Sequence, residues 1–310
     1  MSYNIENGGL RFYKQSGNMN YVKKYIEIIR SNRIDIISFQ ECKMRDIDIS
    51  KIVAEKLGYF HKYFFDKTDF YTKKYYHQAI ISKYPIVYSD EITNVCGVMV
   101  KGVVVNIVNI HLDDEPYIPY SIKGVEYTNT PSNIKSNSDK VDLSFVTKRY
   151  TVTTLMDDKR VLTEPTIIMG DFNEPSHLDY EKVKWKTSKY IMKHGFVDVA
   201  RSIYSDVKKY PLYTVDLYNE KYPAERIDIM YCNRGLKPVK YSNMYKYSDL
   251  SDHIPIVGEF ELKTGKSTIN ANAARSAGVN GVSSSTRNAS ATRNASATRN
   301  ASATRKNRKL

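Results

Sequence analysis

Cysteine is scarce in the 310-residue sequence, and the three that occur, Cys42, Cys96 and Cys232, show no CxxC spacing. This scarcity argues against both a structural zinc site and a disulfide framework, and we expect an intracellular, reducing compartment. No apolar run approaches the roughly 20 residues that a membrane span needs, so we expect no transmembrane segment. The N-terminus also lacks a charged and then apolar leader. With 41% hydrophobic residues, the chain has enough apolar side chains for a folded core.

Acidic residues are missing from the last part of the chain. Residues 264–310 contain nine basic residues and no Asp or Glu, which leaves only +4 of the total net charge of +13 for residues 1–263. Within this tail, residues 288–305 are three copies of Asn-Ala-Ser-Ala-Thr-Arg, which offer no large apolar side chain to bury. We therefore expect a folded domain over 1–263 and a disordered basic tail over 264–310. The tail is a candidate for binding nucleic acid or another anionic surface, and the alternative is a low-complexity extension without a ligand.

Strand and helix patterns mix throughout residues 1–263, with no separation into an all-helical or all-strand half. Apolar runs predict strands over 2–5, 34–39, 59–65, 79–82, 166–169, 226–231 and 254–262, and a hairpin made of 95–100 and 103–110. Helical spacing is found over 18–33, 46–57, 141–157 and 180–193. Residues 115–140 are rich in Pro, Tyr, Ser and Asn and have no clear period, so we expect a long loop that faces the substrate.

Polar residues follow several of these strands, at the points where the strands end. After the strand 166–169 come Gly170, Asp171 and Asn173, a pairing suited to a hard cation or a phosphate, although an ordinary Asx turn would have the same sequence. Other strand or loop ends carry Asn4, Glu41, His111, Asp228, Asp252 and His253. Each one alone could be a capping or solvated residue. Together they supply the carboxylates, amides and imidazoles that metal-assisted phosphoester hydrolysis requires.

The order of these motifs resembles the endonuclease/exonuclease/phosphatase superfamily, which includes deoxyribonuclease I. The matching segments are Tyr3-Asn4-Ile5, Phe39-Gln40-Glu41, 79–86, Asn109-Ile110-His111-Leu112, Gly170-Asp171-Phe172-Asn173, Arg226-Ile227-Asp228 and 251–256. The resemblance covers nearly all of the chain except the tail, so it identifies residues 1–263 as the catalytic domain. It implies an α+β fold, a four-layer α/β/β/α sandwich in which two packed, mainly antiparallel sheets are flanked by helices.

The resemblance also implies a metal site. Glu41 would be the main ligand of Mg²⁺, or of Mn²⁺, with Asn4 beside it and Asp252 near the ion. Glu6 is a possible second acidic neighbour, because some relatives have an acid two residues after the matching asparagine; the alternative is a solvated turn residue.

Catalytic roles follow from the resemblance in the same way. Asp171 and Asn173 would position the attacking water and the phosphate, and His111 would stabilise the developing charge or the leaving oxygen. His253, oriented by Asp228, would act as general base or as a phosphate-binding imidazole. Family assignments of the base differ between this histidine and the carboxylate at the Asp171 position, and the sequence leaves both open.

Gln78 stands where the family has a partner for His111, usually glutamate or asparagine. A neutral partner would leave that histidine with a lower pKa than a carboxylate would. The residues Ala224 to Asp228 lack the Trp-Cys-Asp-Arg signature of the inositol polyphosphate 5-phosphatases, which argues against that branch.

Three functions remain open from the sequence. The first is a Mg²⁺-dependent phosphodiester hydrolase, most simply a monomeric nuclease acting on DNA or RNA. The second is a phosphatase or phosphodiesterase for a lipid or a small phosphate ester, which would need exposed apolar side chains in the 115–140 loop. The candidates for these are Tyr117, Ile118, Tyr120 and Ile122. The third is a catalytically inactive binding protein that keeps the fold.

Overall fold

The computed structural model describes residues 1–66, 76–127, 131 and 133–263, and the predicted basic tail over 264–310 lies outside them. Met1–Lys263 form one compact unit. Within the described part of the chain, no helix combines the length and the apolar character needed to cross a bilayer.

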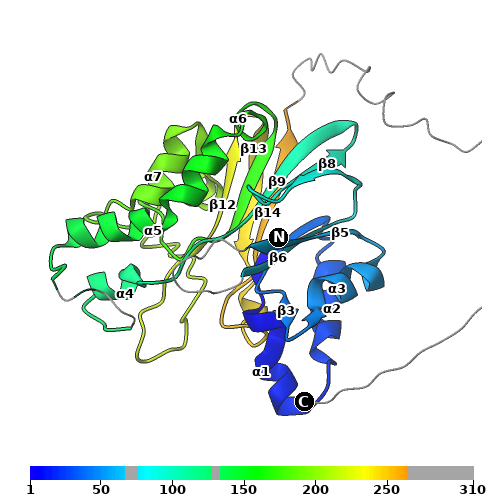
Figure 1. Ribbon diagram of the computed structural model, residues 1–310, viewed down its shortest axis with the longest axis horizontal. Helices are drawn as coiled ribbons and strands as arrows, with labels where there is room; N and C mark the ends of the chain where they lie inside the picture. The colour runs from blue at the N-terminus through cyan, green and yellow to red at the C-terminus, as the bar shows by residue number, and fades with distance from the viewer. Residues whose placement is uncertain (67–75, 128–130, 132, 264–310) are drawn as a thin grey trace, which may run out of the picture. The chain divides into compact units, whose positions relative to one another are not determined.

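The first of two six-stranded sheets contains both ends of the described chain (Figure 1). Its strands, in spatial order, are β13 (Leu236–Asn243), β14 (Ile256–Leu262), β1 (Ser2–Asn4), β2 (Ile36–Gln40), β6 (Tyr76–Ser82) and β5 (Phe60–Asp66). Only β1 and β2 are parallel; the other neighbours in this sheet are antiparallel. The helices α2 (Tyr21–Ser31) and α3 (Ile49–Leu57) pack against it through apolar side chains.

The second sheet consists, in spatial order, of β11 (Phe196–Asp198), β12 (Asp228–Asn233), β10 (Thr166–Asp171), β9 (Val103–His111), β8 (Val95–Val100) and β7 (Ile86–Asp90). Here only β9 and β10 are parallel. The helices α5 (Asn137–Asp157), α6 (Lys159–Thr163) and α7 (Lys186–Lys193) lie on its outer side (Figure 1). The remaining elements are α1 (Glu6–Ser16), β3 (Lys43–Met44), β4 (Ile47–Asp48), α4 (Ile118–Ile122), α8 (Val199–Ile203) and the 3₁₀ helix η1 (Tyr245–Tyr247).

Three apolar cores separate these layers. The middle core lies between the sheets and joins Phe64 and Ile80 of the first sheet to Ile107 and Met169 of the second. A second core packs α2 and α3 on the first sheet, and a third packs α5 and α6 on the second. Each sheet therefore buries both faces, as the near-continuous apolar runs of β2 and β10 require. The predicted four-layer sandwich is confirmed.

A buried polar contact connects the two sheets near the ends of β2 and β9. Gln40 Nε2 donates to Asn109 Oδ1 at 2.6 Å, and Asn109 Nδ2 donates to the carbonyls of Phe39 and Ala79 at 2.9 and 3.0 Å. Both amides are almost fully buried. Because a buried amide is costly unless it is hydrogen-bonded, this contact fixes the register of one sheet on the other. Glu41 follows Gln40, and Ile110-His111 follow Asn109. These residues therefore lie at the same edge of the two packed sheets.

The segment 180–193, predicted as one helix, is helical only from Lys186 onward. Before that point, Val183 and Trp185 are buried while Lys182 and Lys184 are exposed. This alternation is typical of extended chain rather than helix, and it was masked by the helical pattern of the residues that follow. The helix predicted over 46–57 likewise begins only at Ile49, since its first residues form β4.

The segment 115–140, predicted as a loop, contains the short helix α4 and the first turn of α5. Most of its candidate apolar side chains are buried, although Tyr127 is half exposed. Tyr117, Ile118 and Tyr120 are each at most 5% exposed. The two tyrosine rings pack at 4.5 Å between centroids, in a cluster that includes Val215 and Ile227. Three of the four residues named as candidates for an exposed lipid-facing surface are therefore buried, and the fourth, Ile122, is half-buried.

Replacing Asn109 with alanine should destabilise the fold. The substitution removes the inter-sheet amide contact and leaves Gln40 Nε2 without its shortest hydrogen bond, so we expect the free energy of unfolding to fall by about 2–4 kcal/mol. Chemical denaturation of Asn109→Ala measures this. The matched control is Asn20→Ala, an exposed asparagine whose side chain makes no capping bond, for which we expect a change within about 0.5 kcal/mol. Equal stability of the two variants would contradict the role of the contact.

Candidate active site

Three of the predicted residues lie side by side because the register of the second sheet pairs them. Asp171 at the end of β10 is opposite His111 of β9 on one side and Asp228 of β12 on the other. Gly170, the residue before Asp171, allows this close approach. A Cβ atom at Gly170 would lie 1.8 Å from the carbonyl oxygen of Ile110. The glycine that ends the apolar run is therefore needed by the strand packing and not only by a turn.

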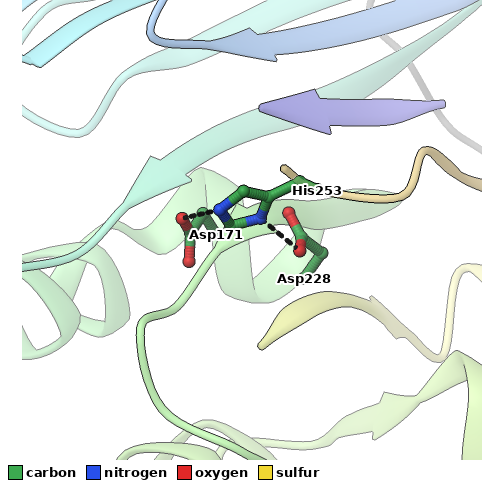
Figure 2. Close-up of side chains that lie close together, drawn as sticks. All are labelled: Asp171, Asp228 and His253. Atoms are coloured by element: carbon green, nitrogen blue, oxygen red, sulfur yellow. Dashed lines mark hydrogen bonds and ion pairs between the residues drawn. The ribbon is translucent and has the colours of Figure 1, made fainter. Parts of the chain in front are cut away.

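His253 lies between two carboxylates (Figure 2). Its Nδ1 contacts Asp228 Oδ2 at 2.8 Å, and its Nε2 is 3.7 Å from Asp171 Oδ2. An ionised carboxylate can only accept, so Nδ1 carries a proton and donates it to Asp228. Burial alone would lower the pKa of His253, but the charges of Asp228 and Asp171 outweigh burial and raise that pKa well above its usual value. The imidazole is therefore fixed in orientation, with Nε2 directed at Asp171.

The backbone around His253 is held by a segment that precedes β12. Val215 forms an isolated antiparallel bridge with His253, and the N–H of Ile254 donates to the carbonyl of Thr214 at 2.8 Å. The hydroxyl of Thr214 also accepts from the N–H groups of Ile227 and Asp228, both at 3.1 Å. A single buried threonine thus connects the two chain segments that bring Asp228 and His253 together.

The first sheet contributes Asn4 and Glu41 to the same edge. Asn4 Nδ2 donates to Asp171 Oδ2 at 3.1 Å and to Glu41 Oε1 at 3.2 Å. The carbonyl oxygen of the Asn4 side chain accepts from the N–H of Glu6. The Asp171 Oδ2 atom also has His111 Nε2 at 3.6 Å, so it lies at the centre of groups from both sheets. Burial raises the pKa of Asp171, and the nearby His253 partly offsets this.

A second group of carboxylates lies beside Asn4. Glu41 has a left-handed backbone, with φ of 52°, and its Oε2 accepts from the N–H of Asn7 at 2.9 Å. Burial and then the charge of Asp252 raise the pKa of Glu41, and the same two causes raise the pKa of Glu6. Glu6 is also paired with Arg11 at 3.1 Å. These three acids therefore repel one another, and a bound cation would relieve the repulsion.

Asn173 has a left-handed backbone, with φ of 46°, which turns the chain sharply after Asp171. Its N–H donates to Asp171 Oδ1 at 2.9 Å, and its Nδ2 donates to the carbonyl of Leu112 at 2.9 Å. The turn is thus an Asx turn, which is the alternative that the sequence left open. It also keeps the side-chain amide of Asn173 beside Leu112, the residue that follows His111.

Gln78 lies beneath this edge, almost fully buried, and its Oε1 has no hydrogen-bond partner within the described part of the chain. Gln78 and His111 line the same narrow, water-sized cavity, together with Asn109. Burial lowers the pKa of His111, which favours the neutral imidazole. The structure therefore brings Gln78 and His111 to one cavity.

The edge can hold a divalent cation. Within the described part of the chain, Asp171, Asp228 and His253 form a group whose ligand atoms all lie within 4.8 Å of one another. The predicted ligands Glu41 and Asp252 are not in this group, although the charge of Asp252 influences the same histidine. Carboxylate oxygen is the donor that Mg²⁺ and Mn²⁺ prefer, so the chemistry of the edge fits a hard cation.

Two buried residues that support the site, Thr214 and Glu174, were missed in the sequence. Thr214 lies in a stretch without periodic pattern, and only its position in space shows what it holds. Glu174, the residue after Asn173, accepts from the hydroxyl of Ser144 at 2.6 Å and from the N–H of Thr187 at 3.1 Å. It thereby fixes the active-site turn to α5 and to the start of α7. An acid directly after the Asp-Phe-Asn motif was the available signal for Glu174.

The model of the endonuclease/exonuclease/phosphatase family matches residues 1–253. The chain belongs to this family, and it is a phosphoester hydrolase. No curated protein matches it in a search by sequence.

Solved structures with the same fold come from several organisms. An AP endonuclease from Archaeoglobus fulgidus is 18% identical, with a TM-score of 0.55 over 84% of this chain and 98% of that one. The 3′ phosphatase NExo from Neisseria, solved with a product DNA hairpin, is 16% identical, with a TM-score of 0.52 over 84% and 98%. A family member from Beutenbergia cavernae is 14% identical, with a TM-score of 0.55 over 84% and 70%. At these identities the likeness shows the fold alone.

Thr214→Val tests how the site is held together. The substitution keeps the shape but removes the acceptor for two buried N–H groups, so we expect the free energy of unfolding to fall by about 2 kcal/mol. Because Asp228 would shift relative to His253, we also expect hydrolysis of an aryl phosphodiester to fall at least tenfold. Thr214→Ser is the matched control, since it keeps the hydroxyl and should retain most of the activity. Similar activity in the valine and serine variants would contradict the assignment.

Proposed function

We propose that the protein is a divalent-cation-dependent phosphodiester hydrolase that acts as a nuclease on DNA or RNA. The observation that carries this proposal is the buried arrangement in which His253 is paired with Asp228 through Nδ1 and directed at Asp171 through Nε2. A histidine held in one orientation by a carboxylate and facing a second carboxylate is suited to moving a proton at a defined atom.

For the cation we propose Glu41 and Asp252 as holding residues, at a position that does not use the His253 imidazole as a ligand. Glu6 is their acidic neighbour, and Mg²⁺ or Mn²⁺ is the ion that such oxygens suit. This placement leaves the Asp228–His253 hydrogen bond intact, whereas an ion bound by Asp171, Asp228 and His253 would displace it. When bound, the cation supplies positive charge that neutralises the phosphate and stabilises the leaving oxygen. The Asn4 side chain would keep Glu41 and Asp171 in position.

Proton transfer is assigned to Asp171 and His253 as a pair. The charge of each side chain shifts the pKa of the other, so neither can be treated as an isolated base. We assign the activation of the attacking water to this pair, and the N–H of Asn173 donates to Asp171 Oδ1. His111, which is neutral because it is buried, can donate a hydrogen bond to the phosphate or to the leaving oxygen.

A polymer substrate is favoured over a lipid one. Of the side chains that a lipid enzyme was expected to expose, Tyr117, Ile118 and Tyr120 are buried, and Ile122 is half-buried. A phosphodiester in a nucleic acid needs no apolar binding surface, because its backbone is recognised through charge and hydrogen bonds.

His253→Ala and Asp228→Asn should each lower kcat/KM for an aryl phosphodiester at least about a hundredfold, because the first removes the imidazole and the second removes the charge that orients it. Initial rates with Mg²⁺ measure this, with circular dichroism as the check on folding. Asp206→Asn, a change at an exposed aspartate of the 204–210 segment, is the matched control and should retain full activity. Full activity in either site variant would show that the site is misplaced.

Removing the metal should abolish hydrolysis. We expect no turnover of the aryl phosphodiester in EDTA and recovery when Mg²⁺ or Mn²⁺ is added in excess. Glu41→Gln should raise the Mg²⁺ concentration for half-maximal rate at least about tenfold, since a neutral amide holds a hard cation less strongly.

Glu259→Gln, at an exposed glutamate of β14, should leave that concentration unchanged. Hydrolysis that persists in EDTA would contradict the cation-dependent mechanism. A Glu41→Gln variant with an unchanged Mg²⁺ requirement would contradict only the placement of the ion.

A further inference from the structure

Residues 182–193 form a strip of exposed lysines. Lys182, Lys184, Lys186, Lys189 and Lys193 are all exposed. Residues 181–193 contain five lysines and one acid, Glu181. Their net charge is therefore +4, equal to that of the whole of residues 1–263. This segment is therefore one of the strongly basic stretches of the folded domain.

The fold, and not composition alone, directs these lysines outward. In the first half of the strip, Val183 and Trp185 are buried in an apolar cluster with Ile118, and the lysines on either side of them consequently point the other way. In the second half, Lys186, Lys189 and Lys193 recur at spacings of three and four, which places them on one face of α7. The extended and helical halves thus both carry lysines that are exposed to solvent.

The lysines of the strip are mostly uncompensated. Lys186 is paired with Asp142, and both side chains remain about half exposed, at 48%. For the other four lysines, no ion pair is found within the described part of the chain. Such unpaired charge is available to an anion from solution, and it is screened only by salt.

The second half of the strip is connected to the segment that follows the candidate active-site turn. Glu174, which follows Asn173 directly, accepts a hydrogen bond from the N–H of Thr187 in the first turn of α7. The N–H of His177 donates to the Ser188 hydroxyl at 2.7 Å, a second connection between the same two segments. The strip is therefore attached to the turn that carries Asp171 and Asn173, with two buried anchor points.

We propose that residues 182–193 bind the phosphodiester backbone of the nucleic-acid substrate, alongside the phosphate that is cleaved. The inference rests on the proposed nuclease function and names the surface that would hold the polymer. Lysines two residues apart in extended chain are ~6.7 Å apart. A nucleic-acid strand carries one phosphate per nucleotide, so successive lysines can meet successive parts of one backbone. None of the exposed large apolar side chains lies within 182–193, so the strip lacks what insertion into a lipid surface would use.

The test compares two triple variants of the full chain. One carries Lys182→Gln, Lys184→Gln and Lys189→Gln, which removes three unpaired charges of the strip. The matched control carries Lys23→Gln, Lys51→Gln and Lys56→Gln, three exposed lysines on α2 and α3 over the other sheet. Binding of a labelled 20-nucleotide DNA, single-stranded and duplex, is measured by fluorescence anisotropy in EDTA over a series of NaCl concentrations.

We expect the strip variant to bind at least tenfold more weakly than the unmodified protein at low salt. Each lysine–phosphate interaction that is removed lowers the slope of log K against log[NaCl] by about 0.7–0.9, so the slope should fall by about 2 to 3. The control triple should change affinity less than about twofold. An unchanged slope and affinity in the strip variant would overturn the proposal, and so would an equal loss in both triples. Binding to phosphatidylserine vesicles that depends on the strip, without DNA binding, would overturn it as well.

Turnover of the aryl phosphodiester separates this proposal from the function on which it rests. The strip variant should hydrolyse that small substrate within about twofold of the unmodified protein, because the lysines are not part of the catalytic group. If the unmodified protein fails to hydrolyse it with Mg²⁺, the proposed catalytic function fails while the binding result still stands. If catalysis is intact and the salt slope is unchanged, only the strip is wrong.

Discussion

The carboxylate of Asp171 is the point on which the arrangement of the site depends. One oxygen, Oδ2, has Asn4 from the first sheet at 3.1 Å, His111 from the neighbouring strand at 3.6 Å and His253 from the chain before β14 at 3.7 Å. A buried carboxylate without such neighbours would be protonated or displaced. The two sheets must therefore meet at this edge in one register.

The register is supplied by features that do not themselves do chemistry. The Gln40–Asn109 contact fixes one sheet against the other, and the close approach at Gly170 sets β10 against β9. Farther out, Arg226 is buried and paired with Asp179 and Asp198, which holds the chain just before Asp228. Since breaking a buried ion pair leaves an uncompensated charge, these residues maintain the geometry of the edge even though none of them faces a substrate.

Much of the fold could be predicted because its local and long-range signals agree. The apolar runs of β2, β9 and β10 are strands in any context, and glycine and polar residues mark where they end. The motif order then defined the family, and the candidate residues meet at one edge. What could not be predicted depends on contacts between distant segments: the burial of Tyr117 and Tyr120 against Val215, the extended half of the 180–193 segment, and the role of Thr214. A local pattern carries no information about which loop will pack over it.

Electrostatics gives this edge two sides with different tasks. Around His253 the charges of Asp171 and Asp228 are balanced by the imidazole, whereas Glu6, Glu41 and Asp252 repel one another and are offset only in part, by Arg11 and His253. The carboxylates with excess negative charge are suited to binding a cation, and the group around His253 is suited to transferring a proton. A phosphate bound between these two groups would contact both.

The most direct test is an anomalous difference map from crystals of the protein soaked in Mn²⁺. The account predicts a single strong peak in contact with the Glu41 carboxylate, with the Asp228–His253 hydrogen bond intact. A peak bound instead by Asp228 and His253, or no peak at this edge, would contradict it.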